Sequence, residues 1–216
     1  MITVEQFKKF APKAKLQTPG GYADLVAVLN KVMKKYGIDQ SPRRIRYFMA
    51  QCHVESQGFT KWEENMRYTT PERLVAVFGT RMTLDKNMVS RAYAPDYLNN
   101  PEKLGNYIYA LRYGNGNVAS GDGYRYRARG VLGLTFRDNY AAYSKATYGD
   151  DRCVTNPDLI SQYEDGIGSA GWFWDSRKLN VLSDTDSFTA QTKVINGSDQ
   201  SVPERLPMLK LANSLF

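Results

Sequence analysis

The chain has 216 residues, of which 42% are hydrophobic, and its 29 lysines and arginines outnumber 22 aspartates and glutamates to give a formal net charge of +7. That length and hydrophobic content suit one large domain or two small ones with a core, and argue against a disordered chain. No stretch reaches the roughly 18 consecutive apolar residues of a membrane span, and residues 1–15 alternate charged with single apolar residues, unlike a secretory signal. We therefore expect no stable membrane insertion, and a cytoplasmic location until another component carries or releases the chain.

The excess of positive charge favours an anionic partner, which is a nucleic acid, an anionic lipid surface or a cell wall carrying carboxylates and phosphates. The arginines are scattered, with small clusters at residues 43–46 and 125–129, and no helix has the continuous basic stripe of DNA-binding arms, so we do not expect nucleic-acid binding. Cys52 and Cys153 are unclustered and lack a histidine pair, which argues against a zinc site or a disulfide framework. We expect two buried reduced thiols, with one bridge after export as the alternative.

The first predicted elements are two helices with clear ends. Residues 22–36 have apolar side chains at helical spacing, lysines in the last turn and Gly37 beyond them as a stop. Ser41 followed by Pro42 predicts the N-cap and first residue of a second helix, which ends near Gly58.

Further helices are predicted by a capping residue followed by proline, at Thr70-Pro71, Asn100-Pro101 and Asn156-Pro157. The apolar segment 167–174 ends in two tryptophans, Trp172 and Trp174, for which core packing is favoured over sugar stacking. Helical spacing resumes from Pro203. With no internal repeat and no long linker, we expect residues 1–216 to form a single domain.

One region differs in kind. Residues 113–123 are nearly all Gly, Asn, Ser and Asp, which predicts an exposed loop that cannot hold a helix. Residues 124–135 read as a short β-prone piece that leads into a helix starting near Thr135. Long loops of this kind are typical of the borders of catalytic clefts.

Glu55 is the first candidate for chemistry. It continues the spacing of Phe48 and Cys52 along the second helix, which places it at the edge of the buried face. A carboxyl group there is expected to have a raised pKa, as a general acid at neutral pH requires. The alternative is a glutamate paired with one of the many arginines.

Glu64 is the second candidate, past the glycine that ends the same helix. A helix followed by a short return can bring two carboxylates to opposite walls of one cleft. Inverting glycosidases need about 6.5 to 9.5 Å between them, so that a water fits beneath the sugar. Glu63 is the rival for the base, and spacing alone does not separate the two.

Together these pieces resemble glycoside hydrolase family 19, and most closely its bacteriophage endolysin branch. The resemblance spans residues 45–200 and rests on the segments AQCHVESQGF, EENMRY, SGDGYRYRARGVLGLTFRDNY, AGWFW and INGS, in that order. It implies that Glu55 is the general acid and Glu64 the general base. It also implies that the hydroxyl of Thr135 helps to hold the attacking water.

The resemblance implies a sugar-binding wall as well. Asn139 and Asn196 match residues that line the sugar subsites, and Tyr140 would buttress the same wall, so all three are predicted substrate-binding residues. Aromatic faces such as those of Trp62 and Tyr124 are expected to stack on pyranose rings. No metal or organic cofactor is implied.

Several positions depart from the family pattern. Val54 stands where a histidine usually precedes the acid, and His53 lies one place earlier, so we assign His53 no catalytic role. Gly133 replaces a glutamine, which removes a substrate contact, while Ala128 and Ser198 replace glycines. These changes affect the predicted binding residues more than the two glutamates.

The implied fold is mainly α and lysozyme-like, with two helical lobes, a cleft between them and a small β element beside the cleft. The implied function is that of a monomeric phage endolysin that hydrolyses β-1,4 bonds of peptidoglycan glycan strands with inversion. The enzyme would pass from the host cytoplasm to the cell wall once a holin opens the membrane. A chitinase on the same scaffold, or a non-catalytic protein that binds cell wall or nucleic acid, is the alternative.

Overall fold

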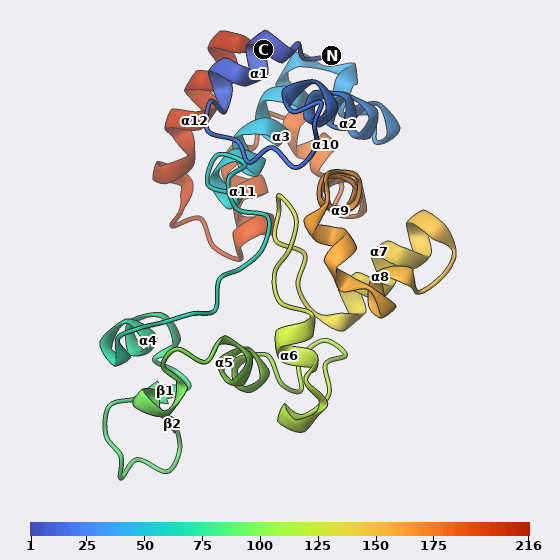
Figure 1. Ribbon diagram of the computed structural model, residues 1–216. Coiled ribbons are helices and arrows are strands. Elements are labelled where there is room, and N and C mark those ends of the chain that lie inside the picture. The colour runs from blue at the N-terminus through green and yellow to red at the C-terminus, as the bar shows by residue number, and fades with distance from the viewer. The chain divides into compact units, whose positions relative to one another are not determined.

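A computed structural model describes all 216 residues, and about 60% of them are helical. The chain forms twelve α-helices and one parallel sheet of two short strands, and none of the helices is both long and apolar enough to cross a membrane. It folds into two compact units. Unit 1 comprises Met1–Glu63, Arg129–Leu134 and Asp158–Phe216, and unit 2 comprises Glu64–Ala128 and Thr135–Pro157 (Figure 1).

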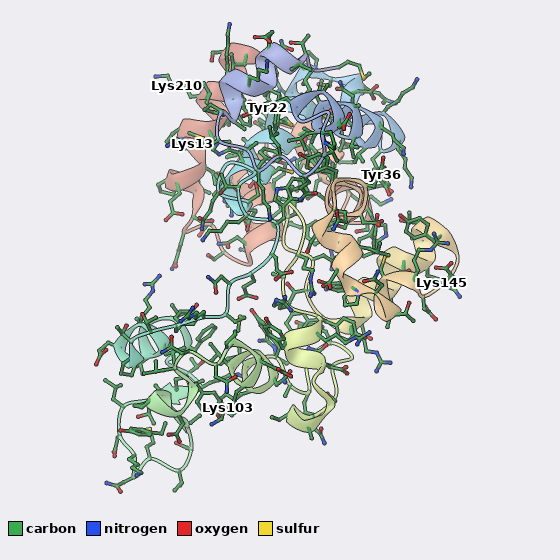
Figure 2. All side chains as sticks on the ribbon, in the orientation of Figure 1. Lys13, Tyr22, Tyr36, Lys103, Lys145 and Lys210 are labelled. Carbon is green, nitrogen blue, oxygen red and sulfur yellow. The ribbon has the colours of Figure 1, made fainter.

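Unit 1 is a set of helices around an apolar core. Its α-helices are α1 (Val4–Phe10), α2 (Tyr22–Lys35), α3 (Pro42–Glu55), α9 (Tyr163–Ser176), α10 (Leu179–Asp184), α11 (Phe188–Asn196) and α12 (Val202–Leu215). The 3₁₀ segment η1 (Ile38–Gln40) joins α2 to α3. At the centre the rings of Phe48 and Trp174 meet edge to face at 5.2 Å, and both side chains are fully buried. The Tyr22 hydroxyl donates to the carbonyls of Ala11 and Pro12 at 3.2 and 2.8 Å, which ties the segment after α1 to α2 (Figure 2).

Unit 2 has a smaller core. Its elements are α4 (Pro71–Phe78), β1 (Met82–Thr83), β2 (Ala92–Tyr93), η2 (Ala94–Tyr97), α5 (Pro101–Ile108), η3 (Val118–Ser120), α6 (Asp122–Arg125), α7 (Arg137–Tyr148) and α8 (Arg152–Thr155), and η4 (Pro157–Ser161) starts at its last residue. The core consists of Met66, Leu74, Met82, Ala94, Leu104 and Ile108. Helices α5 and α6 approach so closely that a Cβ on Gly123 would lie 2.4 Å from the carbonyl oxygen of Gly105. Only a glycine fits this contact without a backbone shift.

The helix starts predicted at Ser41-Pro42, Thr70-Pro71 and Asn100-Pro101 are confirmed, although Thr70 makes no side-chain cap. The Ser41 hydroxyl accepts from the Arg43 N–H at 3.2 Å, and the Asn100 side chain accepts from the Lys103 N–H at 3.0 Å. Gly37 follows α2 with φ of +63°, in the left-handed region that glycine favours. At Asn156-Pro157 the structure has only the 3₁₀ segment η4 instead of an α-helix, and α9 begins later, at Tyr163.

Most of residues 113–123 are exposed as predicted, but the segment does contain helical turns, and the prediction of a β piece after it is wrong. Residues 113–123 include η3, whose start is capped by Asn117, and the first residues of the one-turn helix α6; Asn115 within them is only 6% exposed. Residues 124–135 form isolated bridges rather than a strand, and the regular β pair lies at Met82–Thr83 and Ala92–Tyr93. Asparagine side chains that accept backbone N–H groups allow short helical turns here despite the loop-like composition.

Candidate functional site

Glu55 is the last residue of α3, in unit 1. Three successive residues with positive φ, Gln57, Gly58 and Phe59, turn the chain directly after it. The turn is fixed by Ser56, whose hydroxyl donates to the Cys52 carbonyl at 2.6 Å and accepts from the Phe59 N–H at 2.9 Å. Left-handed conformations in two non-glycine residues are strained, so the surrounding packing must hold this turn in place.

The Glu55 carboxylate forms an ion pair with Arg205 from α12. Arg205 is only 2% exposed and also donates to the buried Gln51 side chain and, at 3.2 Å, to the Ser201 hydroxyl. Gln51 in turn donates to Thr192 of α11 at 3.1 Å. The structure therefore shows the arginine-paired alternative for Glu55, and a buried polar network fixes its carboxylate to α11 and α12.

The contacts of Glu63 are ones that hold the fold together. It forms an antiparallel bridge with Arg129, and its carboxylate pairs with the buried Arg129 guanidinium at 3.2 Å. The Ser161 hydroxyl donates to the same carboxylate oxygen at 3.4 Å, and Asp158 is a second partner of Arg129 at 2.9 Å. These contacts tie residues 63, 129 and 158 of unit 1 together and leave the Glu63 carboxylate committed to an ion pair.

Glu64 has a different environment, in unit 2. The Tyr109 hydroxyl lies 3.0 Å from both carboxylate oxygens, the Ala128 N–H donates to one of them at 3.4 Å, and the Glu64 N–H donates to the Ala128 carbonyl at 2.9 Å. Burial raises the pKa of Glu64, while the hydrogen bonds from Tyr109 and Ala128 and the charge of Arg127 act in the opposite direction. Of the two neighbouring glutamates, Glu64 is the desolvated one.

Three more predicted site residues lie in unit 2, just before α7 and in its first turn. Thr135 is partly buried, and its carbonyl accepts from the Asn139 side chain at 2.7 Å. Tyr140 is fully buried and donates to the Arg127 carbonyl at 2.7 Å. Its role as a buttress stays a prediction, but direct contact with a sugar is wrong because no part of its side chain reaches the surface.

The two aromatic residues expected to stack on sugars differ in exposure. Trp62 in unit 1 is 3% exposed, donates from its indole N–H to the Phe59 carbonyl at 2.9 Å and packs against Tyr163, so it has no free face for a sugar. Tyr124 in unit 2 is partly exposed, but the Arg127 guanidinium lies 4.0 Å from its ring centroid and covers one face. The prediction for Trp62 is therefore wrong, and stacking of a sugar on Tyr124 stays a prediction.

The remaining predicted residues lie in unit 1. Asn196 is exposed at the end of α11, where Gly197 follows with φ of +79°. Trp174 is fully buried in the core, as expected, and Trp172 is partly buried. His53 packs edge to face on Phe10 at 4.9 Å, and burial lowers its pKa. This packing agrees with a structural role for His53.

Cys52 and Cys153 are both buried, as predicted. Burial is also the main cause that raises the pKa of the Cys52 thiol well above its usual value.

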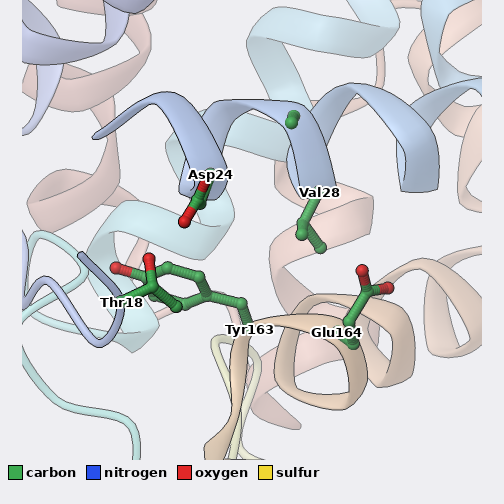
Figure 3. A pocket seen from close by; sticks show the side chains of 6 residues that line it. Thr18, Asp24, Val28, Tyr163 and Glu164 are labelled. Atoms are coloured by element: carbon green, nitrogen blue, oxygen red, sulfur yellow. The ribbon is translucent and has the colours of Figure 1, made fainter. Parts of the chain in front are cut away.

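Unit 1 also has a shallow hollow of about 340 Å³, lined by Thr18, Asp24, Ala27, Val28, Tyr163 and Glu164 (Figure 3). One of its two carboxylates, that of Glu164, is paired with Lys31 at 2.9 Å. None of the predicted site residues lines it.

Arg205 and Tyr109 are functional candidates that sequence reasoning missed. Arg205 lies three and four residues before Met208 and Leu209, so it is a charged residue on the apolar side of the predicted C-terminal helix, and that position is a detectable pattern. Tyr109 lies among several tyrosines between residues 107 and 113, and nothing in that local sequence distinguishes it.

Comparison with known proteins identifies the family, although no family model matches the chain. A glycosyl hydrolase family 19 domain-containing protein of Haemophilus influenzae is 31% identical over 210 residues, which cover 97% of this chain and 94% of that protein. Among solved structures, chitinase C from Streptomyces griseus HUT6037 superposes with a TM-score of 0.60, and a bacterial family 19 chitinase with a TM-score of 0.62. Both are 16% identical in sequence; the match covers 99% of this chain and 76% and 94% of those chains, respectively. The length and identity of the Haemophilus match show that this chain belongs to glycosyl hydrolase family 19.

Proposed function

We propose that the chain hydrolyses β-1,4 bonds between the amino sugars of peptidoglycan, with Glu55 as general acid and Glu64 as general base in an inverting mechanism. The observation that carries the proposal is the environment of Glu64, a desolvated carboxylate whose oxygens receive a phenol and a backbone N–H. Family membership supplies the reaction class. In such a reaction the acid protonates the leaving oxygen while the base removes a proton from the attacking water.

The raised pKa of Glu64 suits a general base. Desolvation makes the carboxylate more basic, and a base takes a proton from water more readily as its own pKa approaches the working pH. The donors around Glu64 act against protonation and so favour the ionised form that a base requires. Thr135, in the same unit, is proposed to hold the attacking water through its hydroxyl, as the family pattern implies.

Peptidoglycan is the proposed substrate because the chain is basic and the polymer carries carboxylates and phosphates. The amino-acid sequences of the segments around Glu55, Glu64 and Thr135 support the endolysin branch. In that branch a holin gives the enzyme access from the host cytoplasm to the cell wall. Chitin is the second candidate, because the two solved structures are chitinases.

The test is digestion of purified peptidoglycan and of chitin, with mass spectrometry of the new reducing-end sugars. Peptidoglycan fragments with new reducing ends support the proposal, and the end sugar distinguishes a muramidase from a glucosaminidase. Chitin oligomers with uncut peptidoglycan would select the chitinase. Polymer binding without any new reducing end would overturn an enzymatic function altogether. The first product should be the α-anomer, because inversion at a β-linked carbon gives the opposite configuration.

Three variants assign the roles. Glu55→Gln and Glu64→Gln should each lose about 10²- to 10⁴-fold in rate, the usual contribution of a general acid or base. Glu63→Gln is the matched control and should keep activity, because Glu63 is engaged by Arg129. An aryl glycoside with an acidic phenol needs no protonation to leave. It should therefore restore turnover to Glu55→Gln and leave Glu64→Gln inactive; the reverse pattern would exchange the two roles.

A further inference from the structure

Tyr109 makes a symmetric contact with Glu64. Its hydroxyl lies 3.0 Å from each of the two carboxylate oxygens, so one phenol proton is shared between them. Burial and the negative charge of Glu64 both raise the pKa of Tyr109, so the phenol keeps its proton and serves as the donor. A donor centred on both oxygens restrains rotation of the carboxylate about its last bond.

The rest of Tyr109 is itself held in place. Its N–H donates to the Gly105 carbonyl at 3.0 Å at the end of α5, and its carbonyl accepts from the buried Asn115 side chain at 2.9 Å. The Asn115 side-chain oxygen accepts from the Arg137 N–H at 3.0 Å, at the start of α7. These hydrogen bonds fix the backbone of Tyr109 between α5 and α7, in addition to the packing of its ring.

The ring of Tyr109 meets that of Phe136 edge to face at 5.4 Å. Phe136 has φ of +75°, a conformation that a non-glycine residue adopts only when its surroundings hold it there. Phe136 directly follows Thr135, the residue proposed to hold the water. One aromatic contact therefore connects the residue that bonds Glu64 with the segment that carries Thr135.

The other titratable and charged groups around the pair are Arg127, Tyr68 and Arg112. Arg127 lowers the pKa of Glu64, and Arg112 lowers that of Tyr109, whereas Glu64 contributes to a raised pKa of Tyr68. Tyr68 has no hydrogen bond to Glu64 among the contacts of that carboxylate. Tyr109 is thus the one side chain shown to donate to both Glu64 oxygens.

We infer that Tyr109 is a positioning residue of this enzyme: its phenol holds the Glu64 carboxylate in a single orientation and favours its ionised form. The inference rests on the proposed function, in which Glu64 is the base. A neutral donor of this kind restrains the base without supplying a full positive charge, which would make the carboxylate less basic. Tyr109 does not touch the substrate in this scheme, because its hydroxyl is occupied by Glu64.

Tyr109→Phe tests the inference because it removes the hydroxyl and keeps the ring contact with Phe136. Loss of the donor destabilises ionised Glu64, so the acidic limb of the profile of kcat against pH should move to higher pH by about one unit. At the optimum, kcat should fall by about tenfold with little change in KM, because the orientation of the base is less restrained. The substrate is a soluble oligomer of whichever polymer the wild-type enzyme cuts.

Tyr107→Phe is the matched control. Tyr107 lies on α5, two residues before Tyr109, but its hydroxyl donates to the Arg81 carbonyl at 3.3 Å and not to Glu64. Its removal should leave both kcat and the position of the acidic limb unchanged. Circular dichroism and thermal unfolding of both variants provide the check on folding, and a folding defect alone would lower the amount of active enzyme without moving the limb.

The outcomes separate the inference from the proposed function. Inactive Glu64→Gln together with a displaced limb in Tyr109→Phe supports both. Inactive Glu64→Gln with an unmoved limb in Tyr109→Phe overturns the inference and leaves the proposed function intact. Retained activity in Glu64→Gln overturns the assignment of the base, and the inference with it.

Discussion

Replacing Arg205 by methionine should destabilise unit 1 strongly. Arg205 is 2% exposed, and methionine fills much of the same volume, so loss of packing is a minor part of the change. Without the guanidinium, the side-chain oxygen of Gln51 loses its donor in a fully buried position, which costs about 1 to 3 kcal/mol. The Glu55 side chain is 25% exposed, so water can hydrate its carboxylate when Arg205 is removed. The loss of this ion pair therefore costs less free energy than the loss of a fully buried pair. We expect a total of about 3 kcal/mol.

A loss of this size should lower the midpoint of thermal unfolding by roughly 6 to 12 °C for a chain of this length. The measurement is urea unfolding followed by circular dichroism, with Lys210→Met as the control on the same helix (Figure 2). Lys210 is exposed and should change the free energy of unfolding by less than about 0.5 kcal/mol. A loss below about 1 kcal/mol in Arg205→Met would refute the argument that this network holds α3 to α12.

Other consequences follow for stability. Burial lowers the pKa of His53, so the neutral imidazole is favoured in the folded chain. The free energy of unfolding should therefore decline as pH falls below about 6.5, by at most about 1.4 kcal/mol per pH unit. His53→Gln should remove that slope in urea titrations at several pH values. Glu63→Gln should cost under about 1 kcal/mol in the same assay, because Arg129 keeps Asp158 as a partner at 2.9 Å. Gly123→Ala should cost about 1 to 3 kcal/mol, since the added Cβ would meet the Gly105 carbonyl; a neutral effect would show that α5 and α6 can separate freely.

The parts of the fold that the sequence predicted are those that depend on neighbours along the chain. The cap of α3 at Ser41 and that of α5 at Asn100 are bonds to a backbone N–H two or three residues away, so they can be recognised without any tertiary information. The β pair could not be recognised in this way. Each strand has two residues, and pairing of Met82 with Ala92 depends on the packing of α4 and η2 beside it.

For the site, the sequence predicted which residues to consider but not their partners. Glu55 and Arg205 are 150 positions apart, so the ion pair is a property of the packing of α3 against α12. The prediction for Trp62 failed for a similar reason. Trp62 was expected to stack on a sugar ring, whereas Gly166 leaves room for the indole ring in the core, where a Cβ would lie 3.0 Å from it.

The two proposed catalytic carboxylates have partners of different kinds, and this difference constrains the mechanism. Arg205 has a full positive charge and forms an ion pair with Glu55, while Tyr109 is a neutral hydrogen-bond donor to Glu64. A general acid must hold its proton when the leaving group departs. If Glu55 is the acid, it must carry a proton and can no longer form an ion pair with Arg205 at that stage, and the aryl glycoside experiment decides whether Glu55 has this role. If the roles are reversed, the same experiment identifies Glu64 as the acid, a role that also agrees with its raised pKa.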